Sequence, residues 1–120
     1  SDTGTNYSAT KFYGASSSSS VQVYHPSNAT SMHVGNGYES LSADTTFTPH
    51  VLHIMNYSNS VTWKTVIARA NLTYSTDNRT SITVGTWRST SAITSVTVYT
   101  DSAGGYRAGS TISLYGIKAA

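Results

Sequence analysis

A β-strand period of two residues runs through Val61-Thr62-Trp63-Lys64-Thr65-Val66-Ile67-Ala68-Arg69. Before it, residues 47–57 form the longest apolar stretch of the chain, and a polar break at residues 56–60 separates the two. The apolar side chains of residues 50–57 do not alternate cleanly, which fits a strand covered on both faces but does not by itself distinguish a strand from a short helix. Five β-branched or aromatic residues in this stretch favour the strand. The sequence therefore predicts a β-hairpin here.

Similar runs recur at short intervals along the chain, separated by turn residues. Asn36-Gly37 is a strong tight-turn signal, and residues 101–109 hold three glycines. We interpret the serine run at residues 16–20 as a loop between two strands rather than a flexible linker, because aromatic residues precede it and an alternating run follows it. Gly85 permits a bend or bulge. The other expected strands are residues 21–24, 31–34, 81–84, 93–99 and 111–117.

The composition agrees with an all-β protein. A chain of 120 residues fits one domain, which we expect to span residues 1–120. Only 10% of the residues are charged, which disfavours exposed helices, whereas Thr, Tyr, Val and Ile suit pleated surfaces. Seven or eight short strands without a helical repeat predict an antiparallel β-sandwich or barrel.

Charge and hydrophobicity also limit the function. The net charge of +2 comes from seven scattered Lys and Arg residues with no basic stripe, so we expect no binding to nucleic acid. The chain has no cysteine and therefore no disulfide or thiolate metal site. No apolar run is long enough to cross a bilayer, so we expect no membrane insertion. The first residues resemble no signal peptide and include no initiator Met, which predicts a fragment or processed end of a longer protein.

The titratable residues do not form a recognisable catalytic pattern. All five acidic residues lie in segments predicted to be terminal or loop, and no nucleophile motif accompanies them, so we expect no enzymatic activity and no cofactor. His50 and His53 are three residues apart, which on a strand places them on opposite faces and prevents both from binding one metal ion. One histidine per chain could still meet its copies at a symmetry axis, and the sequence does not select among His25, His33, His50 and His53.

The aromatic residues divide into expected core and expected surface. Trp63 and Trp87 lie in strand-like runs, so we expect them in the core rather than stacked on sugar rings. Tyr38 and Tyr106 lie in predicted loops and are the better candidates for ligand contact. The alternation in residues 111–117 predicts a closing strand that contributes to the core. Its expected core side chains are Ile112, Leu114 and Ile117.

Four segments in this order resemble the C-terminal domains of tailed-bacteriophage virion proteins. The resemblance covers the chain from about Gly4 to its end and is most specific in the last segment. The segments are His53-Ile54-Met55-Asn56-Tyr57, Trp63-Lys64-Thr65-Val66, Trp87-Arg88-Ser89-Thr90-Ser91-Ala92-Ile93 and Ala108-Gly109-Ser110-Thr111-Ile112-Ser113-Leu114-Tyr115-Gly116-Ile117-Lys118.

The resemblance implies a jelly-roll-like β-sandwich, commonly a homotrimer, on the outer surface of the virion or on a tail appendage, next to other virion proteins. It also implies that Gly109 and Gly116 are backbone-permissive positions and that Arg88 makes a loop or interface contact. Because Gly116 has no side chain, it would allow the backbones of neighbouring subunits to approach closely near the symmetry axis of the trimer.

Three functions fit these expectations. The first is a trimeric tail-fibre module that binds a host-surface polysaccharide, which predicts exposed aromatic and amide side chains at one end. The second is a capsid decoration protein, which predicts a flat docking face. The third is a carbohydrate-binding module of a secreted enzyme, which would normally be monomeric.

Overall fold

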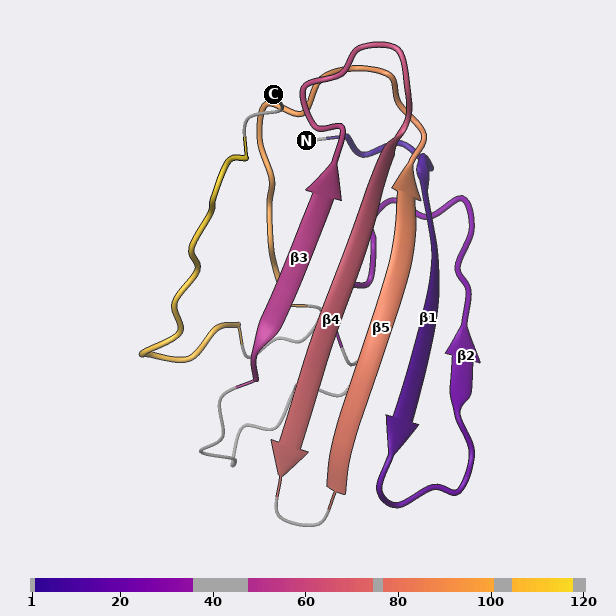
Figure 1. The fold of residues 1–120 in the computed structure, drawn as a ribbon, viewed down its shortest axis with the longest axis vertical. Coiled ribbons are helices and arrows are strands. Elements are labelled where there is room, and N and C mark those ends of the chain that lie inside the picture. Colours follow the sequence, from indigo (N-terminus) through magenta and orange to yellow (C-terminus); the bar gives the residue numbers. More distant parts are fainter. Residues whose placement is uncertain (1, 36–47, 75–76, 101–104, 118–120) are drawn as a thin grey trace.

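The chain forms one antiparallel β-sheet of five strands (Figure 1). A computed structural model describes residues 2–35, 48–74, 77–100 and 105–117. The strands are β1 (Tyr7–Ala15), β2 (Gln22–Tyr24), β3 (His50–Met55), β4 (Lys64–Tyr74) and β5 (Asp77–Trp87). Their order in the sheet is β2-β1-β5-β4-β3. The all-β class is confirmed, and no helix occurs in these residues.

Local pairing follows the sequence pattern closely. Strands β3 and β4 form the predicted antiparallel hairpin, with His50 opposite Ala70 and Met55 opposite Thr65, so residues 50–55 are a strand and not a short helix. The serine run at residues 16–20 joins β1 to β2, as predicted for a loop between two strands. Strands β4 and β5 pair from Lys64 and Trp87 to Tyr74 and Asp77.

The second sheet of the predicted sandwich is not formed by the residues that the structure describes. Residues 31–34, 93–99 and 111–117 have strand-like sequences but belong to no ladder. A segment becomes a strand only when a neighbouring strand pairs with its backbone, and no described strand pairs with these segments. The predicted tight turn at Asn36-Gly37 lies outside the described residues.

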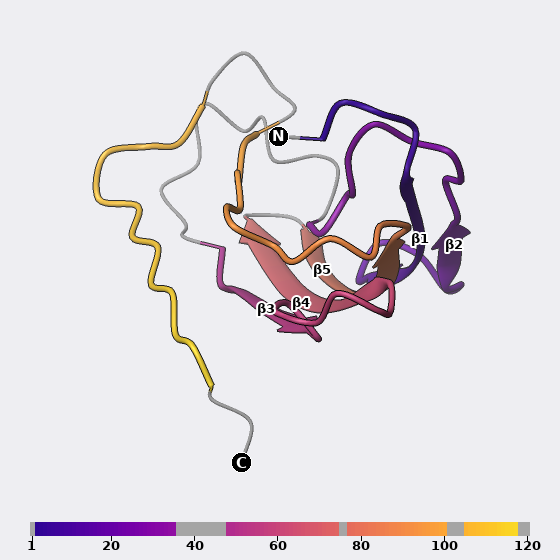
Figure 2. The same ribbon diagram turned by 90° about the horizontal axis from the view of Figure 1, so that it is seen from above.

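The two faces of the sheet differ in what lies over them. We call the first the covered face, because residues 26–35 and the segment after β5 pass over it (Figure 2). Its side chains are small, and the hydroxyl groups of Ser81 and Thr83 are buried there without a hydrogen-bond partner in the described part of the chain. The core is therefore thin. Its buried apolar residues are Ala9, Val66, Ala68, Ala70 and Leu72.

Lys64, the first residue of β4, fixes the chain over the covered face. Its side chain is fully buried, and its ammonium group donates hydrogen bonds to the carbonyl oxygens of Thr62 at 2.7 Å, Thr90 at 3.1 Å and Ser89 at 3.4 Å. An ammonium group has three protons to donate, and burial without acceptors would be costly. Lys64 thus connects the loop before β4 to the segment after β5.

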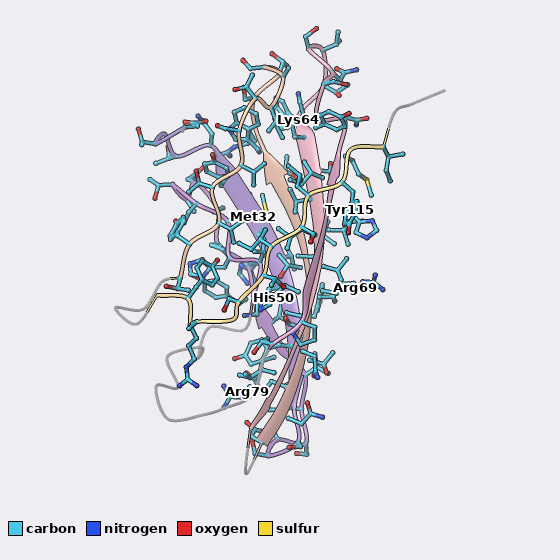
Figure 3. All side chains as sticks on the ribbon, turned by 90° about the vertical axis from the view of Figure 1, so that its left-hand side faces the viewer. Met32, His50, Lys64, Arg69, Arg79 and Tyr115 are labelled. Atoms are coloured by element: carbon cyan, nitrogen blue, oxygen red, sulfur yellow. The ribbon has the colours of Figure 1, made fainter. Side chains whose placement is uncertain are left out.

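Gly85 allows Met32 to lie against the centre of the covered face (Figure 3). The registers of β5 with both β1 and β4 continue through Gly85, so the expected bend or bulge is absent at this position. A Cβ atom at Gly85 would overlap the sulfur of Met32. The absence of a side chain at Gly85 therefore makes the room that Met32 occupies on this face.

We predict that Gly85→Ala destabilises the fold by about 1–3 kcal/mol, because overpacking forces Met32 out of its place. Urea unfolding followed by circular dichroism measures the change. Gly14→Ala is the matched control, since a Cβ atom at that position in β1 meets no atom within 4 Å. Met32→Ala combined with Gly85→Ala should recover part of the loss, and an equal loss in the Gly14 and Gly85 variants would contradict the packing argument.

Asp77, at the start of β5, holds the loop that joins β1 to β2. Its carboxylate accepts hydrogen bonds from Arg79 Nε at 2.7 Å, Ser16 Oγ at 3.0 Å and Ser17 N at 3.2 Å. Chiefly because of Arg79, and with help from the two serines, the pKa of Asp77 is lowered to about 2. These bonds stabilise the ionised carboxylate only in the folded chain.

We predict that this contribution disappears in acid. Because the pKa is about 2 in the folded chain and near its ordinary 3.8 in the unfolded one, the stabilisation is complete above about pH 5 and decreases as the pH falls towards 2. Urea midpoints of the parent and Asp77→Asn should therefore differ at pH 6 and converge near pH 2. A constant difference over that range would show that the ionised carboxylate does not stabilise the fold.

Candidate interaction surface

The second face of the sheet, which we call the open face, carries apolar side chains that the described chain leaves in contact with solvent. Its defining residues have exposed fractions between 42% and 53%, although they lie on strands. Monomeric proteins seldom leave such side chains together on one face, so the open face is a candidate interaction surface. These residues are Phe12, Val23, Val51, Met55, Ile82 and Val84.

Strand register brings four of these side chains and Arg69 into one continuous row. Val23 lies opposite Phe12 and Phe12 opposite Ile82, then Ile82 opposite Arg69 and Arg69 opposite Val51. Adjacent strands are about 4.8 Å apart, so this row crosses all five strands over about 19 Å. The apolar side chains of the row come from β2, β1, β5 and β3, and Arg69 comes from β4.

Arg69 is the one charged residue that a described strand contributes to the open face. It is exposed within the row, between Ile82 and Val51. An arginine can lay its alkyl stem along apolar neighbours and keep five donors for a partner. Apolar surface with an embedded arginine is typical of protein–protein interfaces.

The histidines do not assemble a metal site among the residues that the structure describes. His50 lies opposite Ala70 on the covered face, and His53 lies opposite Ile67 on the open face. The two histidines are therefore on opposite faces of the sheet, as predicted. His33 makes an edge-to-face contact with Tyr24, with ring centroids 5.9 Å apart. No cluster of three or more His, Cys, Asp or Glu side chains occurs in these ranges.

The two acidic residues inside the described ranges are both held by hydrogen bonds. Trp87 Nε1 donates to Asp2 Oδ2 at 2.6 Å, and this bond, followed by those from Asn6 and Gly4, lowers the pKa of Asp2. Trp87 is half-buried and fastens the N-terminal segment to the end of β5. Burial, with the nearby Asp2 charge, raises the pKa of Tyr7.

Trp63 is not in the core of the described chain, which corrects the prediction. Its side chain is 55% exposed, in the loop between β3 and β4 that also holds the exposed Tyr57. The next residue, Lys64, turns toward the covered face and is fully buried, and successive strand side chains point to opposite faces. Asn59 shapes this loop, since its side-chain oxygen accepts hydrogen bonds from the backbone of Val61 and Thr62.

The predicted closing strand is also exposed in the single chain. Ile112 is 69% exposed and Leu114 and Ile117 about 85%, so none of the three is a core residue of the described chain. The reason is that residues 111–117 pair with none of the five strands. Apolar alternation correctly marks side chains that share a face, but it does not supply the neighbouring strand.

Among the remaining predicted positions, Tyr106 is half exposed, while Tyr38 lies outside the described residues. Gly109 has φ of 89°, which confirms a backbone-permissive position. A Cβ atom at Gly116 would meet nothing within 4 Å, so the single chain gives no packing reason for that glycine. Arg88 makes the predicted loop contact. Its guanidinium group donates to Thr5 O and Asn28 Oδ1, both at 2.6 Å.

Comparisons with protein-family models, curated proteins and solved structures find no match to this chain. No helix long and apolar enough to span a membrane occurs in the described ranges.

We predict that an added hydroxyl group changes the free energy of unfolding much less on the open face than on the covered face. Val84→Thr on the open face should change the free energy of unfolding by less than about 0.5 kcal/mol, because the hydroxyl stays hydrated. Val66→Thr on the covered face should cost about 1–3 kcal/mol, since its hydroxyl is buried. Urea unfolding at low protein concentration measures both, and equal losses would contradict the assignment of an open face.

Proposed function

We propose that the chain is a non-enzymatic structural module of a tailed-bacteriophage virion, part of a homotrimeric tail fibre or similar appendage that contacts host-surface polysaccharide. The observation that carries this proposal is the loop between β3 and β4 (residues 56–63), where Trp63 and Tyr57 are exposed at one end of the sheet (Figure 1). Aromatic faces beside hydroxyl and amide groups are the usual contact for sugar rings. Tyr106 is a further exposed aromatic residue.

The trimer supplies what a single weak sugar contact lacks. Three copies presented on one appendage multiply weak contacts into useful avidity. In the assembled appendage, we propose that residues 93–99 and 111–117 become strands and complete a jelly-roll-like sandwich. Their alternating sequences and their exposure in the single chain support this step.

The absence of catalysis is part of the proposal. In the described ranges, the carboxylates of Asp2 and Asp77 are committed to Trp87 and Arg79, respectively. Neither carboxylate has a histidine among its hydrogen-bond partners in these ranges, and the pKa of about 2 makes Asp77 a weak base toward the Ser16 hydroxyl that donates to it. A structural and binding role agrees with this arrangement.

A second candidate function, capsid decoration, is favoured by a different observation. The open face presents the row of apolar side chains around Arg69, which is the kind of flat docking face that a protein bridging capsid subunits would use. A decoration protein would bind capsids and would need no sugar contact.

Binding of the purified, labelled chain to cells of candidate hosts and to their extracted surface polysaccharide tests the first function. We expect Trp63→Ala to weaken binding by roughly two- to tenfold per contact, as expected for about 0.5–1.5 kcal/mol of aromatic stacking. Val61→Ala is the matched control, because Val61 lies in the same loop, is 79% exposed and has no aromatic face.

The counter-test uses virions that lack this protein. Rebinding to their capsids without any binding to cells or polysaccharide would replace the appendage proposal with the decoration one. Binding to cells that Trp63→Ala leaves unchanged would remove the aromatic loop from the proposed contact.

A further inference from the structure

The last described segment, residues 105–117, ends in a strand-like sequence that has no strand partner in the described chain. Residues 110–117 contain no charged side chain, and Ile112 and Leu114 alternate with Ser113. Leu114, Tyr115 and Ile117 are 84–85% exposed, the highest values among the large apolar side chains of the described residues. A segment of this composition is costly to leave in water, and its backbone groups remain available for a ladder.

Strand β3 offers a matching edge. It is the last strand in the sheet order and pairs only with β4, so its outer backbone groups have no ladder among the described residues. Free edges are usually protected by charged residues, a proline or a bulge, and His50–Met55 contains neither a charged residue nor a proline and keeps a regular register. An edge with these properties is suited to accept another strand.

The two segments also have similar lengths and the same spacing of apolar residues. Strand β3 has six residues, and the alternating run at 111–117 has seven. On β3, Leu52 and Ile54 face the covered side, opposite Ala68 and Val66 of β4. Ile112 and Leu114 have the same spacing, so a strand added at this edge would extend the row of core side chains by one strand.

The chain does not make this pairing with itself. Residues 105–117 run outside the β3 edge in both ribbon views, and no ladder joins them to it (Figures 1 and 2). A second copy presents the same edge and needs the same strand. We propose that residues 110–117 of one copy add as an edge strand to β3 of a second copy.

This exchange rests on the self-assembly in the proposed function and specifies its contact. Donor segment and acceptor edge are different surfaces, so the contact is head-to-tail and closes only if the rotation between copies forms a ring. A three-membered ring satisfies every donor and every edge. A reciprocal pair of copies would satisfy them too, so the mass in solution decides between trimer and dimer separately from the exchange.

Because the chain has no cysteine, introduced thiols test the exchange directly. Acceptor variants carry Leu52→Cys or Ile54→Cys, and size-tagged donor variants carry Ile112→Cys or Leu114→Cys. For either strand orientation the four pairs sample three registers, since same-face neighbours recur every second residue. Acceptor and donor are refolded together, oxidised and separated without reductant. The matched control acceptor is Val84→Cys, because Val84 is 44% exposed but lies on the central strand β5.

We expect a mixed disulfide between tagged and untagged chains for at least one edge pair and none for Val84→Cys. Truncation after Gly109 should lower the mass in solution from a multiple of 12.8 kDa to that of a single chain. The inference is overturned if no edge pair forms a mixed disulfide, or if one chain carrying both Leu52→Cys and Leu114→Cys links only to itself. Mixed disulfides in a chain that binds neither cells nor capsids would confirm the exchange and reject the proposed function.

Discussion

The buried ammonium group of Lys64 determines which face of the sheet the segment after β5 covers. Its hydrogen bonds to carbonyl groups of Thr62, Ser89 and Thr90 require the loop before β4 and the segment after β5 to meet at one end of the covered face. A buried ammonium group without these acceptors would be strongly unfavourable, so the two segments are not free to turn the other way. With residues 26–35 and 88–100 committed to that side, the open face remains uncovered within the described chain.

Much of the sheet could be predicted because three of its four strand pairs are local, the exception being the pair of β1 with β5. The hairpins β1–β2 and β3–β4 join strands separated by short loops, and the two-residue period identifies each strand without knowledge of the rest. Residues 93–99 and 111–117 show the same period but form no strand, because a strand also needs a neighbour. Periodicity reports that two sets of side chains point in opposite directions, and it does not report what lies on either side.

The same limit explains why the open face could not be predicted from the sequence. Phe12, Ile82 and Val84 look like core residues in the sequence, and only the path of distant segments shows that their face is open. The strand-like run around Trp63 predicts a core position for it, whereas the buried position belongs to its polar neighbour Lys64. Hydrophobicity alone does not distinguish a core within one chain from a core formed between copies.

The proposed assembly and the proposed binding use separate parts of the molecule. The strand exchange occupies the lateral edge of β3, whereas the loop of residues 56–63 lies at the end of the sheet, beyond the last residue of that strand (Figure 1). Pairing along the edge would therefore orient the loops of successive copies without covering Trp63. A contact that needs avidity depends on this separation, since copies joined through their binding loops could not present them together.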